Sequence, residues 1–211
     1  MSPLPPISIR PLAVADMLAA SALLELGMRD NPTHIQAFGN DPETRRRALG
    51  AMFAPFMRRQ AASGPVLGAF IEGELVGVAG LSLPGRCQPA LMDKLRALPA
   101  LFATGGPRGL WRVYRWTRAW QKQDAKMPRH GHLGPLAVAP AWQGRGIGSA
   151  LLGRLCAELS ERELPGYLET DLAANVRLYQ RFGFTTVAEQ TVIGARQWFM
   201  RREAVANMDE G

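Results

Sequence analysis

A glycine-rich segment from Gln143 to Ser149, with the sequence Gln-Gly-Arg-Gly-Ile-Gly-Ser, holds the residues best suited to bind an anion. The apolar run Leu133–Ala139 before it predicts a strand, and an apolar residue at every fourth position from Ile147 to Leu159 predicts a helix after it. This layout directs several backbone N–H groups to one point at a helix N-terminus, where the helix dipole also favours negative charge. Glycine lets the backbone approach a ligand closely, and Arg145 adds a positive charge. We therefore expect a phosphate or pyrophosphate at this turn.

Two common phosphate loops do not fit the segment. No Gly-Lys-Ser or Gly-Lys-Thr follows it, so the Walker pattern is absent. The dinucleotide spacing requires a third glycine where Ser149 stands, whereas Gly144, Gly146 and Gly148 alternate with other residues. The kind of phosphate ligand therefore has to be inferred with the help of a second motif.

That second motif runs from Gly166 to Phe184 and contains groups that can move protons. Residues 167–170 predict a strand, and residues 174–182 predict a short helix followed by glycine, the favoured residue just past a helix end. Asn175 and Tyr179 are four residues apart and so share one helix face. A tyrosine is protonated at neutral pH and can serve as an acid, whereas Glu169, near the end of the strand, can serve as a base.

The two motifs together resemble those of the GCN5-related N-acetyltransferase (GNAT) superfamily. Its signature Q/R-x-x-G-x-G/A is filled by Gln143, Gly146 and Gly148, and its later half carries the same strand, Asn, Tyr and Gly-Phe. The resemblance implies an α/β (α+β) fold with a mixed, mostly antiparallel sheet, a splay between the fourth and fifth strands, and helices on both faces. The segments Asp-Asn-Pro at 30–32 and Gln-Trp-Phe-Met at 197–200 look closest to the puromycin N-acetyltransferase-like group.

The resemblance also implies acetyl-CoA as acetyl donor and a primary amine as acceptor, and we expect this amine to belong to a small molecule. Backbone groups of one strand would pair with the pantetheine arm and the glycine turn would hold the pyrophosphate, with the Val138 N–H facing the thioester carbonyl. The implied cofactor-binding residues are Leu136, Ala137, Val138, Gln143, Gly144, Arg145, Gly146, Ile147, Gly148, Ser149, Asn175 and Tyr179.

Two residues are implied as catalytic. Tyr179 would protonate the departing thiolate, and Glu169 would take the proton of the amine. Asp171, His132 and water are alternatives to Glu169 as the base.

Two other functions fit the same residues: a non-catalytic sensor that binds acyl-CoA, and an acetyltransferase for protein N-termini or lysines. A sensor would not need the acid Tyr179. A protein acetyltransferase would need an exposed groove, whereas the tryptophan-rich segment described below favours a walled pocket.

The remaining elements are predicted from local patterns. Residues 7–10 predict an edge strand, residues 13–26 a helix ended by Gly27, and residues 31–39 a loop. Asp41-Pro42 predicts the start of a helix with a kink at Pro55, because proline cannot donate the backbone hydrogen bond. Four further runs are strand-like. Residues 66–71 and 75–81 predict a hairpin, and residues 184–189 and 197–201 predict the last two strands.

About 45 residues, 84–129, separate this hairpin from the strand before the glycine turn and need structure of their own. We interpret them as a helical insertion within a single domain spanning residues 1–211. Leu110, Val113, Thr117 and Trp120 lie along one side of the predicted helix. The tryptophans there are interpreted first as core residues, and the insertion as the wall of the acceptor site.

Composition limits the remaining classes of function. A net charge of +7 suggests an anionic partner, but the arginines are scattered and form no nucleic-acid motif. No apolar run reaches the ~20 residues of a membrane span, and the N-terminus resembles no signal peptide, so we expect a cytoplasmic protein, monomeric or homodimeric. Cys87 and Cys156 are too few for a disulfide framework, and the three histidines and two cysteines show no ligand spacing, so no metal site is expected. Residues 203–211 are expected to fray.

Overall fold

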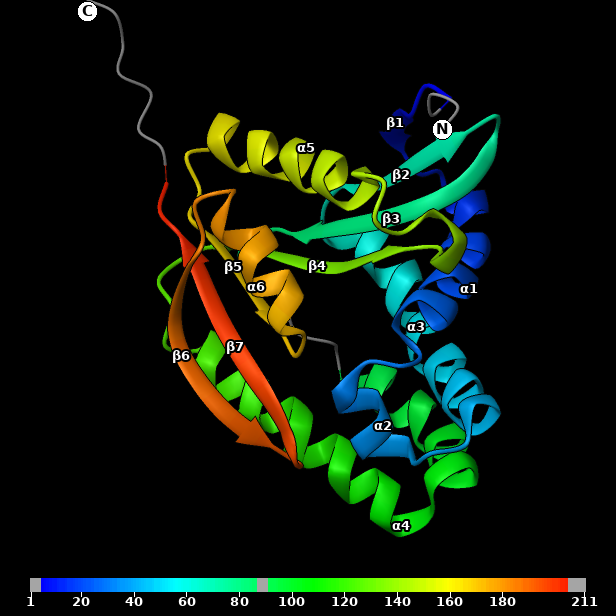
Figure 1. The fold of residues 1–211 in the computed structure, drawn as a ribbon. Helices are drawn as coiled ribbons and strands as arrows, with labels where there is room; N and C mark the ends of the chain where they lie inside the picture. Colours follow the sequence, from blue (N-terminus) through cyan, green and yellow to red (C-terminus); the bar gives the residue numbers. More distant parts are fainter. Residues whose placement is uncertain (1–4, 87–90, 205–211) are drawn as a thin grey trace, which may run out of the picture.

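The computed structural model describes residues 5–86 and 91–204, whose seven strands form one sheet in the order β1-β2-β3-β4-β5-β7-β6 (Figure 1). All neighbouring strands are antiparallel except β4 and β5, which are parallel. The strands are β1 Ser8–Pro11, β2 Val66–Ile71, β3 Glu74–Ser82, β4 Gly131–Val138, β5 Gly166–Thr170, β6 Thr185–Val192 and β7 Ala195–Arg202. The helices are α1 Met17–Met28, α2 Pro32–Phe38, α3 Pro42–Ser63, α4 Leu91–Asp124, α5 Ile147–Glu161 and α6 Ala173–Gln180, with 3₁₀ turns at Val14–Asp16 and Pro140–Trp142.

Helices cover both faces of the sheet, as predicted, because successive strand residues point to opposite faces. Val76 packs with α5 residues such as Leu151 and Leu155 on one face. A β-bulge in the β2–β3 pairing, between Ala69 and Phe70, shifts this alternation by one residue, so Val78 packs with Leu24 of α1 and Leu49 of α3 on the other face. Figure 1 shows α5 and α6 on one side of the strands and α1, α3 and α4 on the other. The sheet therefore separates two hydrophobic cores.

The predicted splay lies between β4 and β5. The two strands pair only at Gly131 with Gly166 and at His132 with Tyr167, whereas β4 stays paired with β3 as far as Val138. From Leu133 onward, one edge of β4 therefore has no neighbouring strand, and Figure 1 shows the two strands diverging there.

The first helix differs from its prediction. A 3₁₀ turn occupies Val14–Asp16, and α1 continues through Gly27 to Met28. Gly27 does not end the helix; a Cβ built on it would lie 3.0 Å from the Ala137 Cβ and 3.1 Å from the Val138 carbonyl oxygen. Gly27 is thus the point where α1 approaches the backbone of β4 closely.

The predicted loop at residues 31–39 is also wrong, because Pro32–Phe38 form α2. Asn31 and Pro32 are favourable residues for a helix start. The Thr33 N–H, unpaired within the first turn, donates to Asp171 Oδ2 at 2.8 Å. A carboxylate 138 residues away therefore completes this short helix, which local sequence could not indicate.

The other elements follow the predictions with shifted ends. Helix α3 continues through Pro55 as far as Ser63. Helix α4, in contrast, contains a residue with non-helical backbone angles, Gly106, whose φ is 59°. Strands β6 and β7 extend to Val192 and from Ala195, longer than predicted. Cys156 is buried in α5, as its pattern indicated, and burial raises the pKa of its thiol. Cys87 and the end of the predicted frayed tail, residues 205–211, lie outside the described residues.

Replacing Gly27 with alanine should destabilise the protein. The added methyl would overpack the contact between α1 and β4, which costs about 1–3 kcal/mol and should lower the thermal midpoint by about 3–10 °C. Gly153→Ala is the matched control in α5, because its methyl would meet only the Phe182 ring at 3.4 Å and alanine favours helix. Thermal unfolding followed by circular dichroism would contradict the close approach if both variants melt alike.

Candidate active site

The glycine turn has the form of an anion cradle. Gly144 and Gly146 have φ of 74° and 83°, in the left-handed region that favours glycine, and Gly146 is the N-cap of α5. None of the backbone N–H groups from Gly144 to Ser149 donates to an acceptor within the described residues. The Gln143 side chain donates to the Val138 carbonyl oxygen at 3.0 Å and so ties the turn to β4. The Arg145 guanidinium lies over the Trp142 ring, 4.8 Å from its centroid, beside the turn.

The backbone of β4 presents alternate residues to the splay. The Ala139 N–H donates to the Val76 carbonyl oxygen at 2.9 Å, and Val138 lies opposite Gly77. By the alternation of an antiparallel ladder, the N–H groups of Leu136 and Val138 then point away from β3, and that of Ala137 points towards it. The splay therefore offers the backbone of two of the three predicted strand residues.

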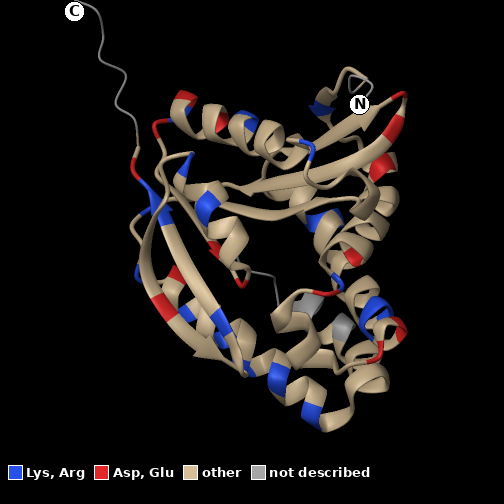
Figure 2. Ribbon diagram, in the orientation of Figure 1, with Lys and Arg blue, Asp and Glu red and all other residues tan. Residues whose placement is uncertain are grey.

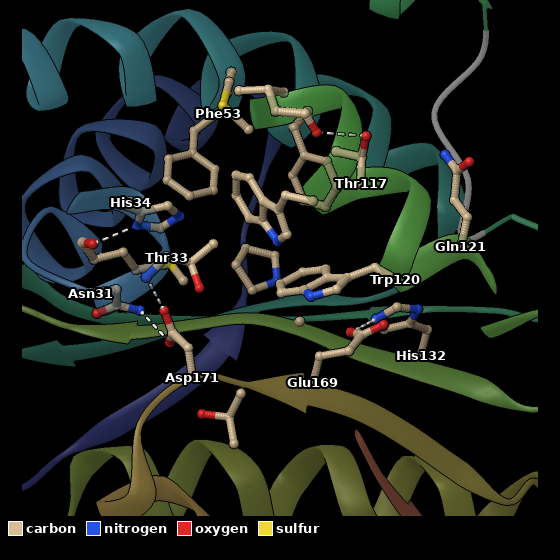
Figure 3. A pocket seen from close by; sticks show the side chains of 18 of the residues that line it. Asn31, Thr33, His34, Phe53, Thr117, Trp120, Gln121, His132, Glu169 and Asp171 are labelled. Carbon is tan, nitrogen blue, oxygen red and sulfur yellow. Dashed lines mark hydrogen bonds and ion pairs between the residues drawn. The ribbon is translucent and has the colours of Figure 1, made fainter. Parts of the chain in front are cut away.

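A cavity of about 770 Å³ runs along the splay. It is bordered by Leu133–Leu136 of β4, by Leu152 and Leu155 of α5, and by Asn175 and Tyr179 of α6. Figure 3 shows its other side, where His34, Phe53 and Trp120 face Glu169 and Asp171 across the space. The cavity thus joins the glycine-turn side of the sheet to the side of α2, α3 and α4.

Glu169 is held at the cavity wall with one oxygen in use. Its side chain is 2% exposed, and its Oε2 lies 2.8 Å from His132 Nε2. Its Oε1 is buried and has no hydrogen-bond partner within the described chain. Burial, and secondly the charge of the nearby Glu169, raise the pKa of the Tyr167 hydroxyl. The hydroxyl and the carboxylate do not meet in hydrogen-bond geometry.

Asp171 has both oxygens engaged. Oδ2 accepts from the Thr33 N–H at 2.8 Å, and Oδ1 accepts from Asn31 Nδ2 at 3.4 Å (Figure 3). Asp171, one of the alternatives predicted as the base, therefore holds the start of α2. His132, another alternative, is hydrogen-bonded to Glu169.

Asn175 and Tyr179 both line the cavity, as their spacing indicated. Burial, and then the charges of Asp171 and Glu169, raise the pKa of Tyr179 well above its usual value. No described residue forms a hydrogen bond with its hydroxyl, which is therefore a protonated donor with no protein acceptor.

The chain matches the acetyltransferase (GNAT) family over residues 21–184. It belongs to this family. Over 80 residues it is 36% identical to mycothiol acetyltransferase of Mycobacterium leprae (strain Br4923). This match covers 34% of this chain and 26% of the relative. The chain thus spans about a quarter of the length of that curated relative.

Solved structures agree with the fold. A structure described as a histone acetyltransferase and related acetyltransferase, from Corynebacterium glutamicum, has a TM-score of 0.69 at 20% identity and covers 96% of this chain and 98% of its own. A GNAT family acetyltransferase from Brucella melitensis in complex with acetyl-CoA has a TM-score of 0.52 at 19% identity, with 98% and 93% covered. The fold predicted from sequence is confirmed, and acetyl-CoA is the acetyl donor of this family.

In this GNAT chain, α4 forms one wall of the cavity. Leu110, Val113, Thr117 and Trp120 all line the cavity, as do Trp111 and Trp116. Trp116 is 4% exposed and contacts His34 and Trp120 edge to face, so the interpretation of the tryptophans as core holds for it. Trp111 is 56% exposed and lies under the Arg115 guanidinium, so it is not a core residue.

Sequence reasoning missed several residues of this wall. Gln197 of β7 is fully buried; it accepts from Trp120 Nε1 at 3.2 Å and donates to the Thr33 hydroxyl. His34 is buried against the Met28 carbonyl oxygen, and this burial lowers the pKa of His34. A polar residue at the centre of a β7 pattern was the available signal for Gln197, but its partners come from distant segments.

The positive charge is spread over the surface. Figure 2 shows Lys and Arg on α3, α4, α5 and β7, with acidic residues between them. Within the run Arg45-Arg46-Arg47, Arg45 is buried and bonded to Asp30 and to the Gly39 carbonyl oxygen. Among the described residues, no helix is long and apolar enough to cross a membrane.

Two tryptophan substitutions should separate wall from core. Trp116→Ala should lower the free energy of unfolding by about 3–5 kcal/mol, because it empties a buried site, whereas Trp111→Ala should cost less than about 1 kcal/mol. Denaturant unfolding of both variants measures this difference. Equal losses would show that the exposed Trp111 is as much a part of the core as Trp116.

Proposed function

We propose that this protein transfers the acetyl group of acetyl-CoA to the primary amine of a small molecule. The observation that carries the proposal is the cavity lined by both Glu169 and Tyr179, in which Glu169 Oε1 is buried without a hydrogen-bond partner among the described residues. A proton acceptor and a proton donor on the two sides of the splay are what acetyl transfer to an amine requires.

The residues present fit acetyl-CoA. The free N–H groups of the glycine turn, from Gly144 to Ser149, suit its pyrophosphate, and the open edge of β4 at Leu136 and Val138 suits the amide groups of its pantetheine arm. Asn175 borders the same path. When bound, acetyl-CoA supplies an acetyl thioester, the electrophile of the reaction.

Each step is assigned to a residue of this chain. Glu169 takes a proton from the attacking amine, directly or through water, while the Val138 N–H donates to the acetyl carbonyl oxygen, on which negative charge develops. As the new C–N bond forms and the C–S bond breaks, Tyr179 gives its proton to the sulfur. Atoms and charge balance, since one proton enters at Glu169 and one leaves from Tyr179.

The raised pKa of Tyr179 keeps its proton in place throughout the physiological range. Transfer to a thiolate is uphill by about 1.5 pKa units for unperturbed groups, and burial of the phenol alone would increase this. The thiolate leaves into the same buried surroundings, and desolvation raises the pKa of a thiol as well. The two effects oppose each other, so Tyr179 remains a workable acid.

The cavity wall supports a small-molecule acceptor rather than a protein. Helix α4 lines the proposed acceptor side with the bulky side chains of Leu110, Val113 and Trp120. Trp116 Nε1, like Glu169 Oε1, is buried without a partner among the described residues. An apolar or aromatic amine with a hydrogen-bond acceptor would satisfy both atoms. The likeness to the puromycin N-acetyltransferase-like group remains a prediction and does not name the acceptor.

Gly146→Val should weaken acetyl-CoA binding at least about tenfold, because a β-branched residue cannot keep φ near 83° and fills the approach to the turn. Gly73→Val in the β2–β3 turn is the matched control, with φ 84° and open space around it. Calorimetric titration of both folded variants tests this. Unchanged affinity in Gly146→Val would remove the pyrophosphate from this turn.

Tyr179→Phe should leave acetyl-CoA binding intact and lower kcat by about 10²–10⁴, the usual worth of a positioned acid. The assay follows acetyl-CoA consumption with the best acceptor from a panel of aromatic, aliphatic and aminosugar amines. A thioester with a better leaving group should recover part of the loss. A kcat within about threefold of wild type, with chemistry rate-limiting, would make water the proton donor. A wild-type protein that binds acetyl-CoA but acetylates no amine would favour the sensor.

A further inference from the structure

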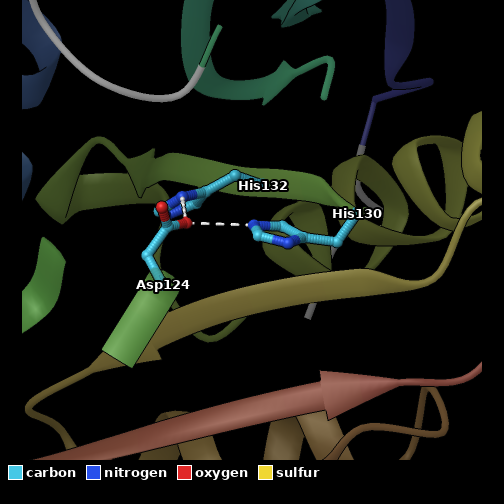
Figure 4. A group of neighbouring side chains, drawn as sticks. All are labelled: Asp124, His130 and His132. Carbon is cyan, nitrogen blue, oxygen red and sulfur yellow. Dashed lines mark hydrogen bonds and ion pairs between the residues drawn. The ribbon is translucent and has the colours of Figure 1, made fainter. Parts of the chain in front are cut away.

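One carboxylate and two imidazoles meet where the end of α4 reaches the start of β4 (Figure 4). Asp124 is the last residue of α4, His130 directly precedes β4, and His132 is its second residue. One ligand atom from each side chain lies within 4.8 Å of the other two. The histidines alone showed no ligand spacing in the sequence; the third group joins them through the turn after α4.

Each imidazole has one ring nitrogen facing Asp124 and the other facing a second oxygen. His130 Nε2 lies 3.0 Å from Asp124 Oδ1, and its Nδ1 lies 2.7 Å from the Pro128 carbonyl oxygen. His132 Nδ1 lies 3.4 Å from the same Asp124 oxygen, and its Nε2 lies 2.8 Å from Glu169 Oε2. Metal-bound histidines usually donate their other ring N–H to a carbonyl or carboxylate, which fixes the ring and its tautomer. Pro128 and Glu169 stand in that position.

We propose that Asp124, His130 and His132 bind one Zn²⁺ ion. Two imidazoles and a carboxylate are a ligand set that suits zinc, with water or the second Asp124 oxygen completing the coordination. Ligand atoms of a tetrahedral zinc site lie about 3.4 Å apart. Side-chain movements of about 1 Å would therefore bring these three ligand atoms to the spacing that a zinc ion requires.

Charge balance favours the exchange of protons for metal. Without metal, protons on the two ring nitrogens that face Asp124 would balance its carboxylate, because a ring nitrogen can only donate to a carboxylate. A divalent ion in place of these two protons leaves the net charge unchanged. This matters because the side chains of Asp124, His130 and His132 are only 14%, 10% and 19% exposed, where added charge is costly. The metal would link α4 to β4 and, through His132, to Glu169.

The site does not depend on the proposed acetyl transfer and is tested without it. Zn²⁺ is titrated calorimetrically into chelator-treated protein that carries no polyhistidine tag, in two buffers of different ionisation enthalpy. One ion should bind with Kd below about 100 µM and release up to two protons, and Zn²⁺ at a hundredfold excess over Kd should raise the thermal midpoint by about 5 °C. A Kd weaker than about 100 µM for the folded wild type would overturn the proposal.

Three variants assign the ligands. Asp124→Asn and His130→Gln keep polar side chains of similar shape and should each weaken Zn²⁺ binding at least about tenfold. His34→Gln removes the remaining histidine, which is bonded to Met28 on the other side of the cavity, and should leave the affinity unchanged. Zn²⁺ binding that is equal in Asp124→Asn, His130→Gln and wild type would mean that the ion sits elsewhere.

Discussion

The separation of β4 from β5 is the constraint on which the site depends. Adjacent strands normally satisfy each other's backbone groups, and a strand edge left open inside a protein is unfavourable unless something else pairs with it. Here the two strands touch at Gly131 and Gly166, where a Cβ on either residue would lie within 2.8 Å of a Leu159 methyl. Two facing glycines thus let α5 press onto the junction. Beyond it, the strands diverge and β4 keeps an edge for a ligand.

The side of the cavity that α2 and α4 line is held open by polar contacts between distant segments. Gln197 bonds Trp120 of α4 and Thr33 of α2, and Asp171 bonds the first turn of α2. Buried polar groups of this kind are stable only when they are satisfied, so they fix the helices at definite positions around the cavity. Apolar packing alone would allow α2 and α4 to collapse into the space.

The parts of the structure that local sequence encodes were predictable. The glycine turn, the pair Asn175 and Tyr179, and the β2–β3 hairpin each depend on residues a few positions apart. Helix α2 was missed although Asn31 and Pro32 suit a helix start, because the contact that completes its first turn comes from Asp171. Gly27 was misread because its role is set by Ala137 and Val138 on another element. A glycine after a helical pattern means an ending or a close contact, and only the fold distinguishes the two.

The two carboxylates of the cavity show why residue type alone could not assign the base. Glu169 and Asp171 lie two residues apart at the end of β5, and either could accept a proton from an amine. Both oxygens of Asp171 already accept hydrogen bonds, so a proton taken there would disrupt the cap of α2. Glu169 Oε1 has no hydrogen-bond partner among the described residues, while His132 fixes Oε2. The difference therefore lies in which oxygens the protein has left unpaired, and this favours Glu169 for proton transfer and Asp171 for structure.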